Sequence, residues 1–172
     1  MRIVLFILFS LLTKTIYCQD STAAIYINSI VQKIEARIAT DISEKKDTTI
    51  FDDSLRRGAY LTVRTEFYTD PQTMQLDKII EKSTYKKITT ELTVYFFANQ
   101  PICFTNKQSE GNTTRVDFDI YYKNDNPVFV QKRNELKGTP DGKMFLKWCY
   151  QLKEDYLKIV QEYDQTFARK KN

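Results

Sequence analysis

Residues 91–104, ELTVYFFANQPICF, return with changes as residues 117–130, DFDIYYKNDNPVFV, 26 residues further along the chain. When the two segments are aligned, apolar positions fall on apolar positions and Tyr95 falls on Tyr121. Each copy has an alternating apolar and polar run, a polar turn and a short apolar return strand, which is the pattern of a β-hairpin. The repeat therefore predicts an antiparallel meander in the middle of the chain.

The length of each hairpin loop decides which face the return strand presents, because directly paired residues lie on the same side of a sheet. In the first copy, a three-residue loop over 98–100 pairs Phe96 with Ile102 and Val94 with Phe104. This pairing gathers apolar side chains on one inner face. A two-residue turn would send the apolar return residues to the other face, so we predict the longer loop.

The second copy leads to the same register. A three-residue loop over 124–126 pairs Tyr122 with Val128 and Ile120 with Val130. The inner face is again apolar and aromatic, as burial requires. The two hairpins are thus expected to share one inner face and to leave the polar side chains, with Tyr95 and Tyr121, on the outer face.

Three further segments complete the predicted sheet or lead into it. Residues 60–68 alternate between apolar and polar positions, as a half-buried strand does. Asp70-Pro71 predicts the turn that follows, because proline restricts its own φ and disfavours helix in the residue before it. Residues 74–85 are expected to form the next strand, with a short helix as the alternative. The charged, threonine-rich residues 43–53 are expected to form a loop.

An amphipathic helix is predicted over residues 22–42, because apolar residues recur three and four positions apart. Ser21 or Thr22 is expected to cap its start. The apolar stripe consists of Ile27, Ile30, Val31, Ile34, Ile38 and Ile42.

A second helix is predicted after the glycine- and proline-containing breaker at 137–142. Its apolar stripe consists of Met144, Phe145, Trp148, Leu152, Tyr156, Ile159, Tyr163 and Phe167. We expect both helices to pack on the inner face, with Trp148 in the core. The predicted fold is α+β: an N-terminal helix, an antiparallel meander of about six strands with a duplicated hairpin, and a long C-terminal helix packed on one sheet face. A sheet curved around the C-terminal helix is the alternative.

Residues 1–18 have the layout of a secretory signal peptide: one early positive charge, an apolar run and a more polar end. The apolar run is too short to span a bilayer. We therefore expect a secreted or periplasmic protein whose residues 19–172 form a single α+β domain, a length that suits one hydrophobic core. A lipid anchor at Cys18 is the alternative, although the residues before this cysteine are not small.

Without the leader the chain keeps two cysteines, Cys103 and Cys149, in an oxidising compartment. One interpretation is a disulfide, and the other is two separate thiols that behave as small apolar residues. The predicted register favours the second, because it turns Cys103 to the outer face. The triplet that begins at Asn112 matches the N-glycosylation pattern, which we interpret only as the mark of a surface loop.

The composition excludes most catalytic chemistry. The 172-residue chain has no histidine, and therefore no Ser-His-Asp triad, Cys-His pair or histidine metal site. Its four glycines are too scattered for a phosphate-binding loop, and no cofactor or metal is expected. Asp117 and Asp119, together with Glu91, support a carboxylate hydrolase as the remaining catalytic hypothesis. Alternating charges are also typical of a solvent-facing strand, so we do not expect an enzyme.

The charge balance argues against a nucleic-acid partner. Removal of Arg2 and Lys14 with the leader leaves 24 basic and 22 acidic residues. This balance gives little attraction to phosphate, and the chain shows no nucleic-acid-binding motif. A transmembrane protein is not expected either, since no apolar run is long enough.

The outer sheet face carries the main functional hypothesis. Tyrosine and arginine on a rigid sheet form a good contact surface, because an aromatic ring buries area while its polar group finds partners. We therefore interpret the chain as a non-catalytic binding protein of unknown partner. The alternative is a carrier or sensor of a small apolar ligand held between the sheet and the C-terminal helix. The candidate binding face consists of Tyr60, Arg64, Tyr68, Tyr95, Phe97, Arg115, Asp117, Asp119 and Tyr121.

Overall fold

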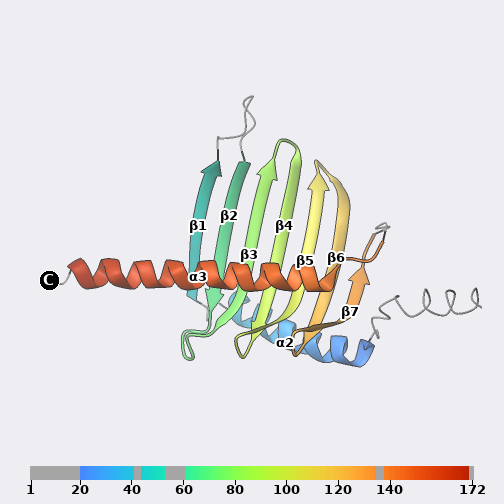
Figure 1. Cartoon of the computed structure of the whole chain (residues 1–172), viewed down its shortest axis with the longest axis horizontal. Helices are drawn as coiled ribbons and strands as arrows, with labels where there is room; N and C mark the ends of the chain where they lie inside the picture. Colours follow the sequence, from blue (N-terminus) through green and yellow to red (C-terminus); the bar gives the residue numbers. More distant parts are fainter. Residues whose placement is uncertain (1–19, 41–43, 53–60, 135–137, 171–172) are drawn as a thin grey trace, which may run out of the picture.

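The computed structural model describes residues 20–40, 44–52, 61–134 and 138–170. Within these residues the chain forms a seven-stranded antiparallel sheet whose strand order is the chain order, with a helix before it and a helix after it (Figure 1). The predicted α+β meander is confirmed, with seven strands in place of about six. The elements are α2 (Ser21–Ala39), β1 (Glu44–Asp52), β2 (Leu61–Thr69), β3 (Leu76–Tyr85), β4 (Ile88–Phe97), β5 (Gln100–Glu110), β6 (Thr113–Lys123), β7 (Asn126–Lys132) and α3 (Gly142–Lys170).

The additional strand is β1, in the segment that was predicted to be a loop. Its sequence, EKKDTTIFD, pairs with β2 from Glu44 opposite Thr69 to Asp52 opposite Leu61. As an edge strand it has one neighbour, and charged residues are common on edges because they discourage pairing with other chains. The charges that suggested a loop are therefore compatible with a strand. For β3, the strand is confirmed and the helix alternative is wrong.

The first repeated hairpin turns through Ala98 and Asn99, which have φ values of 50° and 64°. Two successive positive φ angles are the mark of a type I′ turn, whose twist matches that of paired strands. The register then shifts by one, which leaves Ile102 as the extra residue of a β-bulge. Beyond the bulge, the predicted pairing of Val94 with Phe104 is confirmed.

The second hairpin is built in the same way. Asn124 and Asp125 have φ values of 50° and 59°, and Val128 is the extra residue that follows. The predicted pairing of Ile120 with Val130 is confirmed. Each predicted three-residue loop is in fact a two-residue turn plus one bulged residue, which has the same effect on the register further along the strands.

Next to the turns the predicted pairs are wrong by one residue. Phe96 pairs with Pro101, and Tyr122 pairs with Pro127. The sequence could not show this, because a bulge moves one backbone position without changing the apolar pattern beyond it.

The two helices lie on opposite faces of the sheet, with α3 in front and α2 behind in Figure 1. The prediction that both pack on one face is therefore wrong. The sheet is open, with β1 and β7 at its opposite edges (Figure 1). The buried cluster on the α3 face is Phe67, Leu76, Ile79, Leu92, Val94, Phe96, Phe104, Phe118, Ile120, Tyr122, Val130, Phe145, Leu146, Cys149 and Tyr156. The buried cluster on the α2 face is Ala24, Ile27, Ile34, Tyr95, Ile102, Cys103 and Tyr121.

The beginning of α3 is held against the second hairpin at Gly142. A Cβ atom added at this glycine would lie 2.6 Å from the Cβ of Pro127, so only glycine allows this close approach. The hydroxyl of Tyr122 donates to the Gly142 carbonyl at 3.0 Å. This contact fixes where the helix meets the sheet.

Trp148 lies at the edge of the α3 contact and not in the core. Its side chain is 47% exposed and packs edge-on against Phe145, with ring centroids 5.4 Å apart. The apolar stripe of α3 includes side chains that the sheet does not bury. Periodicity alone therefore led to the wrong prediction that Trp148 lies in the core. The two remaining cysteines are buried free thiols, Cys103 under α2 and Cys149 under α3, so the interpretation as separate thiols is confirmed.

Candidate functional site

The α2 helix covers much of the predicted binding face. Tyr95 and Tyr121 are only 9% and 2% exposed, and Asp119 is buried beside them. The prediction that these three side chains face solvent is wrong. Tyrosine, threonine and cysteine side chains occur both at solvent-exposed positions and beneath a helix. Their alternation along the strands therefore did not show that α2 covers this face.

Glu35 of α2 binds two residues of this face. One carboxylate oxygen accepts hydrogen bonds from the Tyr95 hydroxyl at 2.6 Å and from the Lys78 ammonium at 2.5 Å. Burial raises the pKa of Tyr95, and the Glu35 carboxylate raises it further. Tyr95 is thus a neutral hydrogen-bond donor that holds α2 on the sheet.

A second polar group joins α2 to β6 and to Arg133, the residue that follows β7. The Tyr121 hydroxyl lies 3.2 Å from the Asn28 side-chain oxygen of α2 and 3.4 Å from a carboxylate oxygen of Asp119. Arg133 forms ion pairs with Asp119 and with Asp117, the latter at 2.7 Å. Burial raises the pKa of Asp119 although Arg133 opposes the shift.

The carboxylates of the hydrolase hypothesis are therefore engaged in ion pairs. Asp117 and Asp119 share Arg133, and Glu91 forms an ion pair of 3.1 Å with Lys82. Ion pairs of this kind are common on a charged sheet face.

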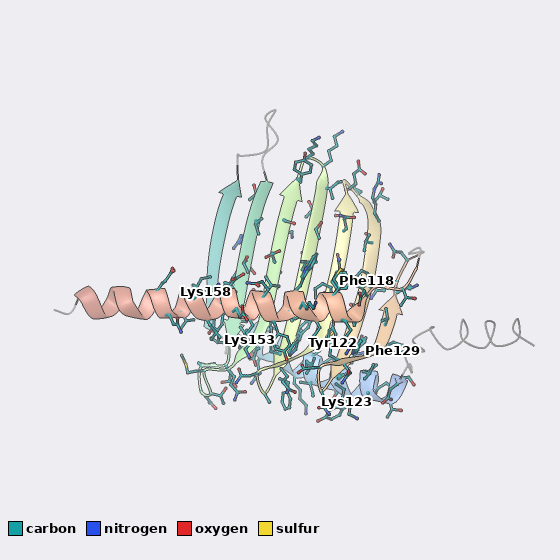
Figure 2. All side chains as sticks on the ribbon, viewed as in Figure 1. Phe118, Tyr122, Lys123, Phe129, Lys153 and Lys158 are labelled. Atoms are coloured by element: carbon teal, nitrogen blue, oxygen red, sulfur yellow. The ribbon has the colours of Figure 1, made fainter. Side chains whose placement is uncertain are left out.

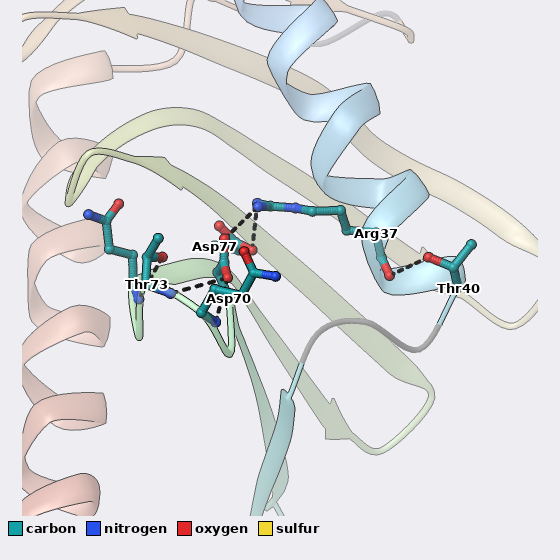
Figure 3. Close-up of polar contacts among 7 residues, drawn as sticks. Arg37, Thr40, Asp70, Thr73 and Asp77 are labelled. Atoms are coloured by element: carbon teal, nitrogen blue, oxygen red, sulfur yellow. Dashed lines mark hydrogen bonds and ion pairs between the residues drawn. The ribbon is translucent and has the colours of Figure 1, made fainter.

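A third polar group fixes the end of α2 (Figure 3). The two guanidinium nitrogens of Arg37 bind Asp70 and Asp77, each at 2.7 Å. Asp70 lies in the turn between β2 and β3, where its carboxylate also accepts the backbone N–H of Gln72 at 2.9 Å. Sequence reasoning missed this contact, because the partners are more than thirty positions apart and no local pattern links them.

The other residues of the predicted binding face are dispersed. Arg64 is exposed and forms an ion pair with Glu66 at 3.0 Å, and Glu66 also accepts the Tyr68 hydroxyl at 2.8 Å. Arg115 is exposed near the end of the sheet away from α2 and pairs with Glu110. Tyr60 lies outside the described residues.

An apolar groove lies where the first turns of α2 pass the two repeated hairpin turns, at the lower end of the sheet in Figure 1. Its volume is about 580 Å³. Phe97, from the predicted binding face, lies at this groove and is 54% exposed, and Tyr26 of α2 is 65% exposed. Its lining residues are Asp20, Thr22, Ala23, Tyr26, Ile27, Ile30, Phe97, Ala98, Gln100, Pro101, Ile102, Tyr122, Lys123 and Asn124.

The groove follows from the repeat that dominates the sequence. Both turns contribute lining residues, Ala98 from the first and Asn124 from the second, and bulged Ile102 adds an apolar side chain. The sequence did not reveal the site because the N-terminal helix was predicted on the other face of the sheet. The repeated Asn-containing turns were the signal that could have located half of it.

A smaller hollow of about 270 Å³ lies beneath α3. It is lined by Glu81 of β3 and by Trp148 and Asp155 of α3, together with Leu92, Gln151 and Leu152. Burial, and then the nearby Asp155 carboxylate, raise the pKa of Glu81. This pair of carboxylates was not among the residues that the sequence suggested.

Among residues 20–40, 44–52, 61–134 and 138–170, no three His, Cys, Asp or Glu side chains group as metal ligands. In the same residues, neither α2 nor α3 combines the length and apolar character needed to cross a bilayer. Comparison with protein-family models, with curated proteins and with solved structures found no match for this chain.

Proposed function

We propose that this chain is a non-catalytic binding protein that carries or senses a small apolar ligand in the groove between α2 and the repeated hairpin turns. The observation that carries the proposal is the groove itself, with its volume of about 580 Å³ and mainly apolar lining. Binding sites for small molecules are commonly concave, mainly apolar and of about 300–1,000 Å³. The signal-peptide pattern of residues 1–18 supports a secreted or periplasmic location for this activity.

The ligand position differs from the one that the sequence suggested. Around Phe145 the space between the sheet and α3 is filled by packed rings, with centroids 4.8 Å from Phe104 and 5.4 Å from Phe118. The hollow farther along α3, of about 270 Å³, is smaller than the groove of about 580 Å³. On the other face, Tyr95 and Tyr121 are bonded to α2. A partner bound flat on the tyrosines would have to displace this helix, whereas the groove is already open.

The experiment measures binding of a neutral fluorescent apolar probe, Nile red, to the mature chain. Gln100→Trp should fill the groove, because Gln100 is exposed and lines it. Thr113→Trp is the matched control, since Thr113 is exposed at the start of β6, at the opposite end of the sheet. We expect roughly tenfold weaker probe binding for Gln100→Trp and unchanged binding for Thr113→Trp. Equal binding by all three proteins would contradict the proposal.

A carboxylate hydrolase is the second candidate, and one observation favours it. Glu81 has a raised pKa beside the Asp155 carboxylate and the exposed Trp148 ring, as a general acid in a sugar-binding cleft would. A panel of nitrophenyl glycosides tests it. Turnover that Glu81→Gln abolishes would favour this function, and absence of turnover by the wild-type chain would remove it.

A further inference from the structure

The groove contains one cationic side chain, Lys123, at the end of β6 (Figure 2). In the part of the chain that the structure describes, Lys123 takes part in no ion pair. Lysines elsewhere on the sheet do pair with carboxylates, as Lys82 does with Glu91. The charge of Lys123 is therefore available to a bound molecule.

The acidic residue of the groove is engaged differently. Asp20 caps α2: its carboxylate accepts the backbone N–H of Ala23 at 2.9 Å. Its own N–H donates to the Val128 carbonyl at 3.0 Å. A capping carboxylate interacts favourably with the positive end of the helix dipole, so its charge is partly balanced within the protein.

We propose that the ligand is an amphiphile with an apolar chain and an anionic head, and this inference rests on the function proposed above. The apolar chain of the ligand would lie along Ile27, Ile30 and Ile102, and its anionic head would form an ion pair with the ammonium of Lys123. Lysine suits this place because its apolar stem can follow the groove wall while its charged end stays in water. The side-chain amides of Gln100 and Asn124, which line the same groove, can hydrogen-bond the head.

The apolar chain and the anionic head of the ligand are expected to contribute separately to the binding affinity. Each methylene that leaves water should strengthen binding by about fourfold, whatever the head group. The head should matter less, because Lys123 is exposed and its ion pair is weakened by water. A preference of about fivefold for a carboxylate over an alcohol of the same length is expected at low salt, and it should shrink as salt screens the pair.

The experiment is calorimetric titration of the mature chain with decanoate, decanol and decyltrimethylammonium. Lys123→Met should remove the preference for decanoate over decanol, and Lys123→Arg should keep it. Lys143→Met is the matched control: it removes the same charge near the same hairpin, but Lys143 contacts Asn126 at 3.4 Å and does not line the groove. This variant should bind as the wild-type chain does.

The outcomes separate the two proposals. If decanol binds as tightly as decanoate and Gln100→Trp blocks both, the groove binds apolar ligands and the anionic head is wrong. If the preference survives Lys123→Met, Lys123 is not the head-group site and the inference is overturned. If none of the three amphiphiles binds, the proposed function fails together with the inference.

Discussion

The two faces of the sheet are both buried, but by different chemistry. Against α3 the sheet presents rings and aliphatic side chains. The hydrogen bonds of α3 lie at its beginning and at the hairpin turns, as between Tyr122 and the Gly142 carbonyl and between the Tyr150 hydroxyl and Asp125. Against α2 it presents tyrosines and charges that bond to Asn28, Glu35 and Arg37 of the helix. The α3 face therefore contributes mainly through apolar burial, and the α2 face through directional contacts.

The two faces contribute to stability and to geometry in different ways. Apolar burial stabilises strongly but does not specify one arrangement closely. Partly buried ion pairs such as Glu35 with Lys78 contribute little net stability, because desolvation offsets much of their attraction. We infer that they fix the position of α2 along the sheet, and with it the width of the groove.

The largest expected effect concerns the α3 face. Phe104 is fully buried and its ring stacks on Phe145 at 4.8 Å, so Phe104→Ala should leave a cavity and cost about 3–5 kcal/mol of unfolding free energy. Urea titration measures it. Phe97→Ala is the control on an exposed phenylalanine and should cost about 1 kcal/mol or less. Similar costs for the two variants would show that the α3 face is not the main core.

A smaller effect is expected from the polar contacts of the α2 face. Tyr121→Phe keeps the ring but removes the hydroxyl bonded to Asn28, which should cost about 1–2 kcal/mol. Tyr85→Phe, on a tyrosine that is exposed at the far end of the sheet, should change the stability by less than about 0.5 kcal/mol. Urea titration of both variants decides whether α2 is held by this hydroxyl; equal stabilities would mean that it is not.

Trp148→Ala should cost only about 1 kcal/mol, although tryptophan is the largest side chain of α3. Trp148 is about half exposed, and its ring packs edge-on against Phe145. The sequence alone predicted a core tryptophan and a cost of about 3–5 kcal/mol. A thermal unfolding curve distinguishes the two values, and a loss near the upper one would return Trp148 to the core.

The smallest effect is a pH dependence specific to the α2 face. Because the pKa of Asp119 is raised above its ordinary 3.8 in the fold, the native state holds this proton more tightly than the unfolded state does. The contribution of Asp119 to stability is therefore greatest when it is protonated and falls as the pH rises from 3.8 through the raised value. The Asp119→Asn variant should lack this decline in the free energy of unfolding. The difference in unfolding free energy by which it is less stable than the wild type should therefore decrease as the pH rises through that window.

Urea titrations at several pH values measure this narrowing. Asp117→Asn is the control, since Asp117 binds the same Arg133 but is less buried. A deficit of Asp119→Asn that widens as the pH rises would mean that the ion pair with Arg133 outweighs burial, which is the opposite sign.

Much of the sheet could be predicted because hairpins are local. In each repeated hairpin, the alternation of apolar residues and the turn residues a few positions away predicted the register. The pairs Val94 with Phe104 and Ile120 with Val130 were predicted correctly in this way. The strand β1 was missed because charged residues on an edge strand resemble a loop.

The placement of the helices could not be predicted in the same way. The isoleucine stripe of α2 shows that one side of the helix is buried, but it does not name the face of the sheet that buries it. Tyr95 and Tyr121 are amphipathic and fit water or a helix equally well. Because the groove depends on where α2 lies, the wrong placement of α2 also hid the candidate site. Of the predicted residues that the structure describes, only Phe97 lines the groove.

The strand order has a consequence for how the molecule folds. Each strand pairs with its neighbour in the chain, so the sheet can grow hairpin by hairpin with short loop closures, which favours rapid folding. The α2 helix is the exception: its Asn28 meets Tyr121 across a sequence separation of 93 residues. We therefore expect α2 to dock last, and pulsed hydrogen exchange during refolding should show its amides protected after those of β4 to β6. The groove would then be the last part of the molecule to form, and a ligand that fills it would bind only the finished fold.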